Sequence, residues 1–313
     1  MTTIVANERA VFLEEIIEQC RPYCESGKLA EYIPELANAD KQTLGITVQG
    51  IGDQGISVGD CDHKFTIQSI SKVFTLLLAL MDHGENKVFE RVGKEPTGDV
   101  YNSMLKLETI APGKPFNPFI NAGAIAVTDL IKGNSKEEKF ERIINFIRKL
   151  SRSDQIGWDE SVYRSEAKTA SRNRALAYLL QENGILGEDV EASLDVYFKQ
   201  CSIEVTCSNL AQMAVILANN GQDPESGEQM VPSQYVRMVK TFMVTCGMYN
   251  ASGEFALEVG LPAKSGVSGG IIAVVPGRMG IGTIGPALDD KGNSITGIQM
   301  LQRLSRAWDL SMF

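Results

Sequence analysis

The 313-residue sequence contains only two histidines, His63 and His83. A Ser-His-Asp triad needs a positioned histidine, and zinc sites commonly use several. Because His63 lies among charged residues and His83 directly precedes a glycine, neither suggests such a site. If the protein is a hydrolase, we therefore expect its general base to be a lysine or a tyrosine.

The six cysteines are scattered along the chain and form no Cys-x-x-Cys pair. Residues 1–20 lack a basic segment and carry Glu14, Glu15 and Glu18 within their apolar pattern, so we expect no secretory signal. We therefore expect a cytoplasmic protein. Since disulfides are rare in that compartment, we also expect the cysteines to be reduced and mostly buried.

Basic stretches and long apolar runs are also missing. The net charge is −9, from 30 Lys and Arg against 39 Asp and Glu. Because sequence-independent binding to nucleic acid depends on Lys and Arg, we expect no nucleic-acid partner. The longest apolar run is too short to span a bilayer, so we expect no membrane partner. With 43% hydrophobic residues, the chain can form a large core.

That apolar run, Val73 to Met81, follows the tetrapeptide SISK at 69–72 and ends before Gly84. Ten or so apolar residues without alternation predict a helix buried on most faces, and a closing glycine predicts its end. Ser69 then lies at or near the first turn, with Lys72 three residues on and on the same face.

This arrangement suits a nucleophile. Unpaired N–H groups at a helix start favour negative charge on the Ser69 oxygen. Burial of Lys72 would lower its pKa until a neutral amine could take the serine proton. Ser71 is a competing hydroxyl but points to another face. Two further Ser-x-x-Lys sequences, at 103–106 and 165–168, lie in polar sequence without this context.

The remaining pattern predicts an α+β protein with an antiparallel sheet. Strands are expected within 44–58, 241–249, 263–277 and 279–285, and the first and last should share one sheet. Helices are expected over 7–20, 136–150, 171–182, 188–200, 207–219 and 294–308. We predict a sheet domain from residues 1–84 and 226–313, interrupted by a helical domain from 85–225.

Two glycine-containing motifs lie in the last third of the chain. Lys264-Ser265-Gly266 precedes a strand-like run, and the N–H of Val267 could pair with that of Ser69 as an oxyanion hole. The sequence GIGTIG at 280–285 resembles a dinucleotide fingerprint. Because Pro286 follows and no helix opens there, we predict a glycine-rich strand instead.

A Ser-x-x-Lys at a helix start combined with Lys-Thr/Ser-Gly on an edge strand is found in serine β-lactamases and penicillin-binding proteins. Over nearly its full length the chain more closely resembles the serine-dependent glutaminases of bacteria, which share that fold. The matching segments are YIPEL at 32–36, QSISKV at 68–73, NPFINAGAI at 117–125, RSE at 164–166, RN at 172–173, YF at 197–198, CGMY at 246–249 and LPAKSGVSGG at 261–270. Cys246 stands where many relatives carry serine.

The resemblance implies a β-lactamase-like fold, a homo-oligomer (dimer or tetramer), and hydrolysis of L-glutamine to L-glutamate and ammonia through an acyl-enzyme, without metal or organic cofactor. It also implies roles for particular residues. Ser69 would be the nucleophile, Lys72 its proton acceptor, Tyr197 a proton relay, Lys264 an electrostatic influence, and the Ser69 and Val267 N–H groups the oxyanion hole. Substrate contacts would come from Tyr32, Gln68, Asn121, Glu166, Asn173 and Tyr249, in addition to Ser69, Tyr197 and Val267.

Two other functions fit parts of the pattern. A β-lactamase or D,D-peptidase would use the same serine and lysine. The expected lack of export, and an acid at 166 suited to an amino acid's ammonium, speak against it. A non-catalytic glutamine sensor would bind the ligand without releasing ammonia, and the intact Ser69 and Lys72 speak against that.

Overall fold

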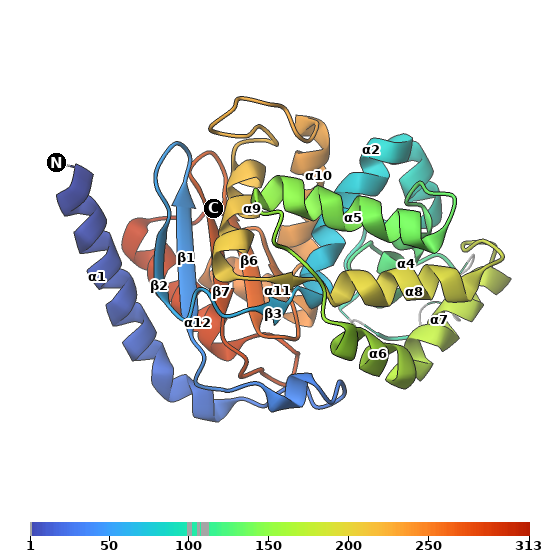
Figure 1. The fold of residues 1–313 in the computed structure, drawn as a ribbon, viewed down its shortest axis with the longest axis horizontal. Helices are drawn as coiled ribbons and strands as arrows, with labels where there is room; N and C mark the ends of the chain where they lie inside the picture. Colours follow the sequence, from blue (N-terminus) through green and yellow to red (C-terminus); the bar gives the residue numbers. More distant parts are fainter. Residues whose placement is uncertain (1, 99–101, 105–106, 108–112) are drawn as a thin grey trace.

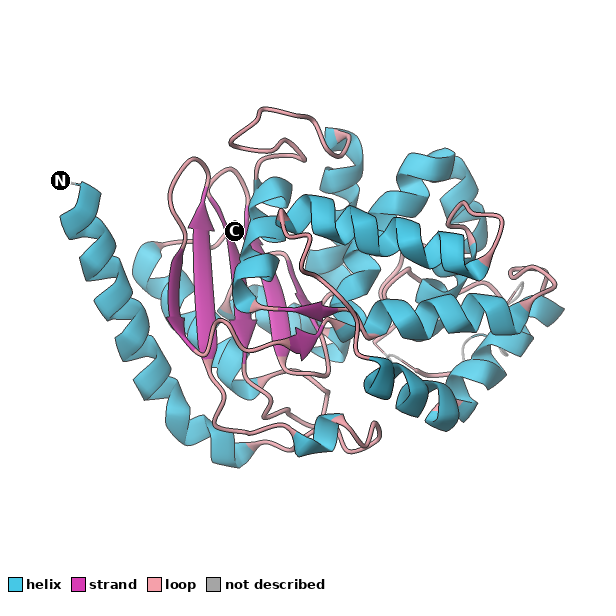
Figure 2. Ribbon diagram, in the orientation of Figure 1, coloured by secondary structure: helices cyan, strands magenta, loops and turns pink. Residues whose placement is uncertain are grey.

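The computed structural model describes residues 2–98, 102–104, 107 and 113–313. An antiparallel sheet with helices against both of its faces forms one part of the molecule, and a group of helices packs beside it (Figures 1 and 2). The α+β class predicted from the sequence is confirmed.

The main sheet has the strand order β2-β1-β7-β6-β5, and each neighbouring pair is antiparallel. β1 pairs with β7, so that Gly45 lies opposite Ile284 and Gly50 opposite Met279. The first and last segments therefore share one sheet, as predicted. The strands are β1 (Gly45–Gly50), β2 (Ile56–Gly59), β5 (Ala263–Ser265), β6 (Gly270–Val275) and β7 (Met279–Ile284).

Alternating side chains of β6 enter two different cores. Ile271 and Val275 pack with α1 (Thr2–Cys20) and α12 (Ile295–Trp308) on one face. Ile272 and Val274 pack on the opposite face, in the core that also holds α9 (Cys207–Ala218). Because successive side chains of a strand point to opposite faces, the continuous apolar sequence of β6 is that of a strand covered on both sides.

The glycines of β7 allow α9 to lie directly on the sheet. A Cβ on Gly280 would come within 2.2 Å of the Val215 nitrogen, and one on Gly282 within 2.3 Å of the Cys207 carbonyl oxygen. The sequence at 280–285 is therefore a glycine-rich strand, as predicted. Its glycines serve close helix packing.

The helical group packs around α2 (Ser71–Arg91) (Figure 1). Its other helices are α4 (Asn121–Asp129), α5 (Lys136–Ser151), α6 (Glu160–Thr169), α7 (Ser171–Glu182), α8 (Val190–Cys201) and α10 (Ser233–Cys246). Within the predicted helical segment, β4 (Glu204–Val205) pairs with β3 (Phe65–Thr66), and α9 belongs to the sheet layers. The domain boundaries at 84/85 and 225/226 stay a prediction.

Three local expectations were wrong or incomplete. The strand expected at 241–249 is the end of α10 and a 3₁₀ turn, Tyr249–Ala251, because Val236, Val239 and Met243 continue a buried helical stripe into it. Gly84 interrupts α2 with a non-helical backbone, φ 75° and ψ 167°, as expected, but a second helical stretch that was not predicted follows it to Arg91. The sequence also gave no signal for α4, α6 and the short α11 (Ser252–Glu258).

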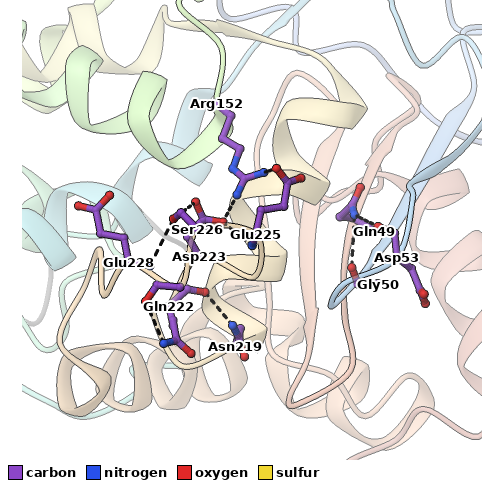
Figure 3. Close-up of polar contacts among 11 residues, drawn as sticks. Gln49, Gly50, Asp53, Arg152, Asn219, Gln222, Asp223, Glu225, Ser226 and Glu228 are labelled. Carbon is purple, nitrogen blue, oxygen red and sulfur yellow. Dashed lines mark hydrogen bonds and ion pairs between the residues drawn. The ribbon is translucent and has the colours of Figure 1, made fainter.

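The loop between α9 and α10 is held to the end of α5 by a polar cluster (Figure 3). Arg152, whose left-handed backbone caps α5, forms ion pairs with Asp223 and Glu225. Asp223 also accepts hydrogen bonds from the Ser226 hydroxyl at 2.8 Å and from the backbone N–H of Glu225 at 3.0 Å. We call Arg152, Asp223, Glu225 and Ser226 the α5 clamp.

All six cysteines are free and buried, as expected. None of the helices among the described residues has the length and apolar character needed to cross a membrane. In that same part of the chain, no three His, Cys, Asp or Glu side chains gather as a metal ion would require.

Candidate active site

Ser69 lies in a 3₁₀ turn, Gln68–Ile70, between β3 and the first residue of α2. The α-helix thus begins two residues after the serine, slightly later than expected. Gln68 has a φ of 48°, a left-handed conformation that is uncommon for a residue other than glycine. Ser69 remains partly exposed, whereas Gln68 and Ile70 are buried. The turn therefore presents one hydroxyl to an adjoining pocket.

Lys72 lies beneath this turn and is 1% exposed. Its Nζ donates to the Asn121 side-chain oxygen at 2.7 Å and to the Phe119 carbonyl at 3.2 Å. Asn121 in turn donates to the side-chain oxygen of Asn173 at 3.0 Å. Burial lowers the pKa of Lys72 from 10.5 to about 8, although Cys201 and Glu166 act in the opposite direction. A neutral amine, able to accept a proton, is therefore accessible near neutral pH.

A cavity of about 340 Å³ opens beside Ser69. Its walls contain seven residues predicted as site residues: Tyr32, Gln68, Ser69, Asn121, Glu166, Asn173 and Tyr197. They come from the N-terminal segment, the Ser69 turn, α4, α6, α7 and α8. Segments far apart in the sequence therefore converge on one pocket, of a size suited to a small ligand.

Glu166 is the acidic group of this pocket. It lies on α6, is 7% exposed, and its Oε2 has no hydrogen-bond partner among the described residues. Burial raises the pKa of Glu166 from 4.5 to about 8, and Lys72 acts in the opposite direction. A buried carboxyl without a partner costs free energy, so its presence suggests that a bound group completes its contacts.

Several pocket residues were not among the predicted site residues: Ile33, Asn102, Thr169, Ala170, Arg172 and Cys201. Cys201 follows Tyr197 by four residues on α8, so helical spacing could have indicated it. Arg172 adjoins Asn173 and donates its Nε hydrogen to the Asn102 carbonyl at 2.7 Å. The other residues carry no chemical signal in the sequence.

The turn between β5 and β6 packs against the Ser69 turn. A Cβ on Gly266 would lie 2.9 Å from the Ile67 carbonyl oxygen and 3.4 Å from the Gln68 Cβ. Val267 follows directly and is 4% exposed. Among the described residues, its backbone N–H has no hydrogen-bond partner. This N–H is thus near the serine turn and free to donate.

Lys264 and Tyr249 form a neighbouring group that does not line the cavity. Lys264 lies on the edge strand β5, and its Nζ donates to the Ser265 carbonyl at 2.7 Å and lies 4.4 Å from the Tyr249 ring centre. Burial, and then the charge of Lys72, lower the pKa of Lys264 well below its ordinary value. Tyr249 borders a separate cavity of about 140 Å³ with Phe119 and Cys246. Its role as a substrate contact stays a prediction.

The other Ser-x-x-Lys sequences differ from the one at Ser69. Ser165 and Lys168 lie on α6, where Lys168 is exposed and its ammonium is solvated. Lys106, of the sequence at 103–106, lies outside the described residues. Of the lysines in these sequences that the structure describes, Lys72 alone has a buried amine.

Comparisons with known proteins agree on one family. The family model described as Glutaminase matches residues 27–313. A glutaminase of Alkaliphilus metalliredigens is 54% identical over 96% of this chain and 99% of its own, and one of Geobacillus thermodenitrificans is 53% identical over 96% and 97%.

Solved structures agree. A Bacillus glutaminase determined in 4.3 M NaCl has a TM-score of 0.91 and 43% identity, over 97% of this chain and 100% of its own. A Bacillus subtilis glutaminase, in covalent complex with 5-oxo-L-norleucine formed from 6-diazo-5-oxo-L-norleucine, has a TM-score of 0.90 and 42% identity over the same shares. This likeness confirms the β-lactamase-like fold. With matches in sequence and structure along almost its whole length, the chain belongs to the glutaminase family.

Proposed function

We propose that the protein hydrolyses L-glutamine to L-glutamate and ammonia, with Ser69 as the nucleophile. The observation that carries this proposal is a partly exposed serine three residues before a buried lysine whose pKa is about 8, at a pocket that also holds a carboxyl with one unpartnered oxygen. Membership of the glutaminase family supports the choice of substrate.

In the first half-reaction, Lys72 accepts the Ser69 proton as the serine oxygen attacks the side-chain amide carbon of glutamine. The N–H groups of Ser69 and Val267 donate to the oxygen that becomes negatively charged. Collapse of the tetrahedral intermediate breaks the C–N bond. The departing nitrogen takes a proton from Lys72 through the Tyr197 hydroxyl and leaves as ammonia.

In the second half-reaction, water attacks the acyl-enzyme ester. The same groups take the proton from water and return it to the Ser69 oxygen, which releases glutamate. The covalent complex of the related Bacillus subtilis glutaminase supports a covalent intermediate.

Recognition of a free amino acid fits the polar groups of the pocket. Glu166 would ionise on meeting the α-ammonium of glutamine, because an adjacent cation favours the carboxylate. Tyr32, Asn121 and Asn173 supply phenol and amide donors for the α-carboxylate. The unpartnered Oε2 of Glu166 supports its part in this proposal.

The test measures ammonia release from L-glutamine by the wild type and by Ser69→Ala, without added metal. We expect activity in the wild type and none above background in the variant. Ser57→Ala, at an exposed position of the edge strand β2, serves as a control that should keep wild-type activity. Ammonia release by Ser69→Ala at the wild-type rate would overturn the proposed nucleophile.

We also propose a cytoplasmic location and a homo-oligomer, dimer or tetramer. The six free, buried cysteines support the location, because reduced thiols are typical of that compartment. Light scattering on the purified protein would measure the mass relative to the 34.2 kDa chain. A single-chain mass would exclude the oligomer.

A further inference from the structure

A line of buried polar side chains runs from α4 through α8 to the Ser69 turn. The hydroxyl oxygen of Thr128 lies 3.1 Å from the Oε1 atom of Gln200. The Gln200 Nε2 lies 3.5 Å from the Ser71 Oγ, at the long limit of a hydrogen bond. Ser71 donates its hydroxyl hydrogen to the Gln68 carbonyl oxygen at 2.7 Å. We call Ser71, Gln200 and Thr128 the support line.

The support line is separate from the substrate cavity. Each of its three side chains is 0% exposed. The described residues that line the cavity do not include any of them. Ser71 therefore does not reach substrate, and its hydroxyl proton is already engaged. This agrees with the sequence analysis, in which Ser71 is a competing hydroxyl that points to another face.

The bond from Ser71 acts on the strained residue of the turn. Gln68 adopts a left-handed backbone at φ 48°, which persists only where surrounding contacts hold it. A serine hydroxyl has one proton and can rotate. An amide donor from Gln200 occupies a lone pair of the Ser71 oxygen and so directs the serine proton toward the Gln68 carbonyl.

The support line also connects the two elements that carry Tyr197 and Ser69. Gln200 follows Tyr197 by three residues on α8, so both lie on one face of that helix. Gln68 directly precedes Ser69. The contacts of Ser71 therefore link α8, which carries Tyr197, to the residue that precedes Ser69.

We propose that Ser71 is a positioning residue of the reaction, directed by Gln200, and that it holds the Ser69 turn in its reactive geometry. The inference rests on the proposed function of Ser69. Displacement of reacting groups by about 1 Å can lower a rate about 100-fold, so support of the turn has a measurable effect on catalysis.

The test compares Ser71→Ala with the wild type. We expect kcat to fall by about 10- to 100-fold, while KM for glutamine stays within about threefold because the cavity walls are unchanged. The rate of covalent labelling by 6-diazo-5-oxo-L-norleucine should fall in parallel. Ser71→Cys, which keeps a weak donor, should lie between the alanine variant and the wild type.

Ser202→Ala is the matched control. Ser202 is also 0% exposed and lies at the end of α8, but its hydroxyl donates to the Phe198 carbonyl at 2.9 Å, away from the turn. We expect its kcat to stay within about twofold of the wild type. Gln200→Met should also lower kcat. The double variant with Ser71→Ala should be no slower than the slower single variant, because both substitutions remove the same contact between Gln200 and Ser71.

Equal losses of kcat in Ser71→Ala and Ser202→Ala, or a wild-type kcat in Ser71→Ala, would overturn the positioning role. If Ser71→Ala does not fold, a wild-type labelling rate and kcat in Gln200→Met would overturn it instead. Failure of the proposed function looks different, since the wild type itself would then release no ammonia.

Discussion

The active-site pocket and the α5 clamp use charged groups in opposite ways. In the pocket, burial displaces the pKa of Lys72 down and that of Glu166 up, each to about 8 and each toward its neutral form. In the α5 clamp, burial also opposes ionisation of Asp223. There, however, hydrogen bonds from Glu225 and Ser226 and the charge of Arg152 outweigh it and hold the Asp223 pKa below its ordinary value.

The pocket and the α5 clamp differ in the hydrogen-bond and charge partners of their carboxylates and amines. Lys72 donates to neutral amide oxygens, and one oxygen of Glu166 has no partner among the described residues. The surroundings of Lys72 lower its pKa from 10.5 to about 8. At 1.36 kcal/mol per pKa unit, this shift means that keeping the buried ammonium charged costs about 3 kcal/mol. The pocket is therefore arranged for reactivity, and the clamp for stability.

The largest expected effect is that of Lys72→Met. We expect kcat to fall by at least about 1,000-fold, because the variant lacks the amine that takes the Ser69 proton. The free energy of unfolding near pH 7 should equal or exceed that of the wild type, because an apolar side chain replaces a buried ammonium. Ammonia release and denaturant unfolding measure the two. Lys168→Met, at an exposed lysine, is the control expected to leave both unchanged.

The pH dependence of kcat/KM follows from the same pKa values. Lys72 must be neutral and Glu166 ionised, and both conditions are met as pH rises through about 8. We expect kcat/KM to rise at least about tenfold between pH 7 and pH 8 and to level off only above about pH 9. A profile that is flat from pH 6 to pH 9 would contradict the assignment of Lys72 as the base.

Glu166→Gln should have an intermediate effect. Loss of the charge-assisted contact to the α-ammonium should weaken glutamine binding by about 1.5–3 kcal/mol, which is an increase in KM of about 10- to 100-fold. Because Glu166 raises the pKa of Lys72, the rising limb of the pH profile should also move to lower pH. Wild-type kinetics in this variant would show that Glu166 does not bind the substrate.

Asp223→Asn should have the smallest effect on activity, since the α5 clamp lies outside the pocket. We expect the free energy of unfolding at pH 7 to fall by about 2 kcal/mol and kcat to stay within about twofold. The stabilisation from a carboxylate with a lowered pKa is present above its unfolded pKa of about 3.9 and is lost as pH falls through the folded value. The difference between the variant and the wild type should therefore shrink below about pH 4, as measured by urea unfolding.

Sequence reasoning was most successful where a pattern is local. The buried helix after Ser69 and the glycine-rich strand β7 were predicted from such patterns. The shared sheet of β1 and β7 is not local, and it was predicted from the order of strand and helix signals along the chain. It was wrong at 241–249, because the apolar residues there belong to a helical stripe that begins at Val236. The break of the helix at Gly84 was predicted, but the second helical stretch from there to Arg91 was not.

Seven predicted site residues do line one pocket. Local pattern had singled out Ser69, and the family resemblance had assigned roles to the other six. Arg172 and Cys201 were missed as pocket residues, since side chains that line a cavity need no distinctive neighbours in the sequence.

The sequence by itself determined most of the strand and helix types and the placement of Lys72 three residues after Ser69, because these depend on spacing and composition over short segments. It also indicated the family, through motifs that match along nearly the whole chain. The tertiary structure alone decided that Asn121 meets the Lys72 amine, that Gly266 lies against the serine turn and that Gln200 approaches Ser71. It also decided the pKa values of Lys72 and Glu166. Burial and distant contacts set those values, and both arise when segments far apart in the chain pack together.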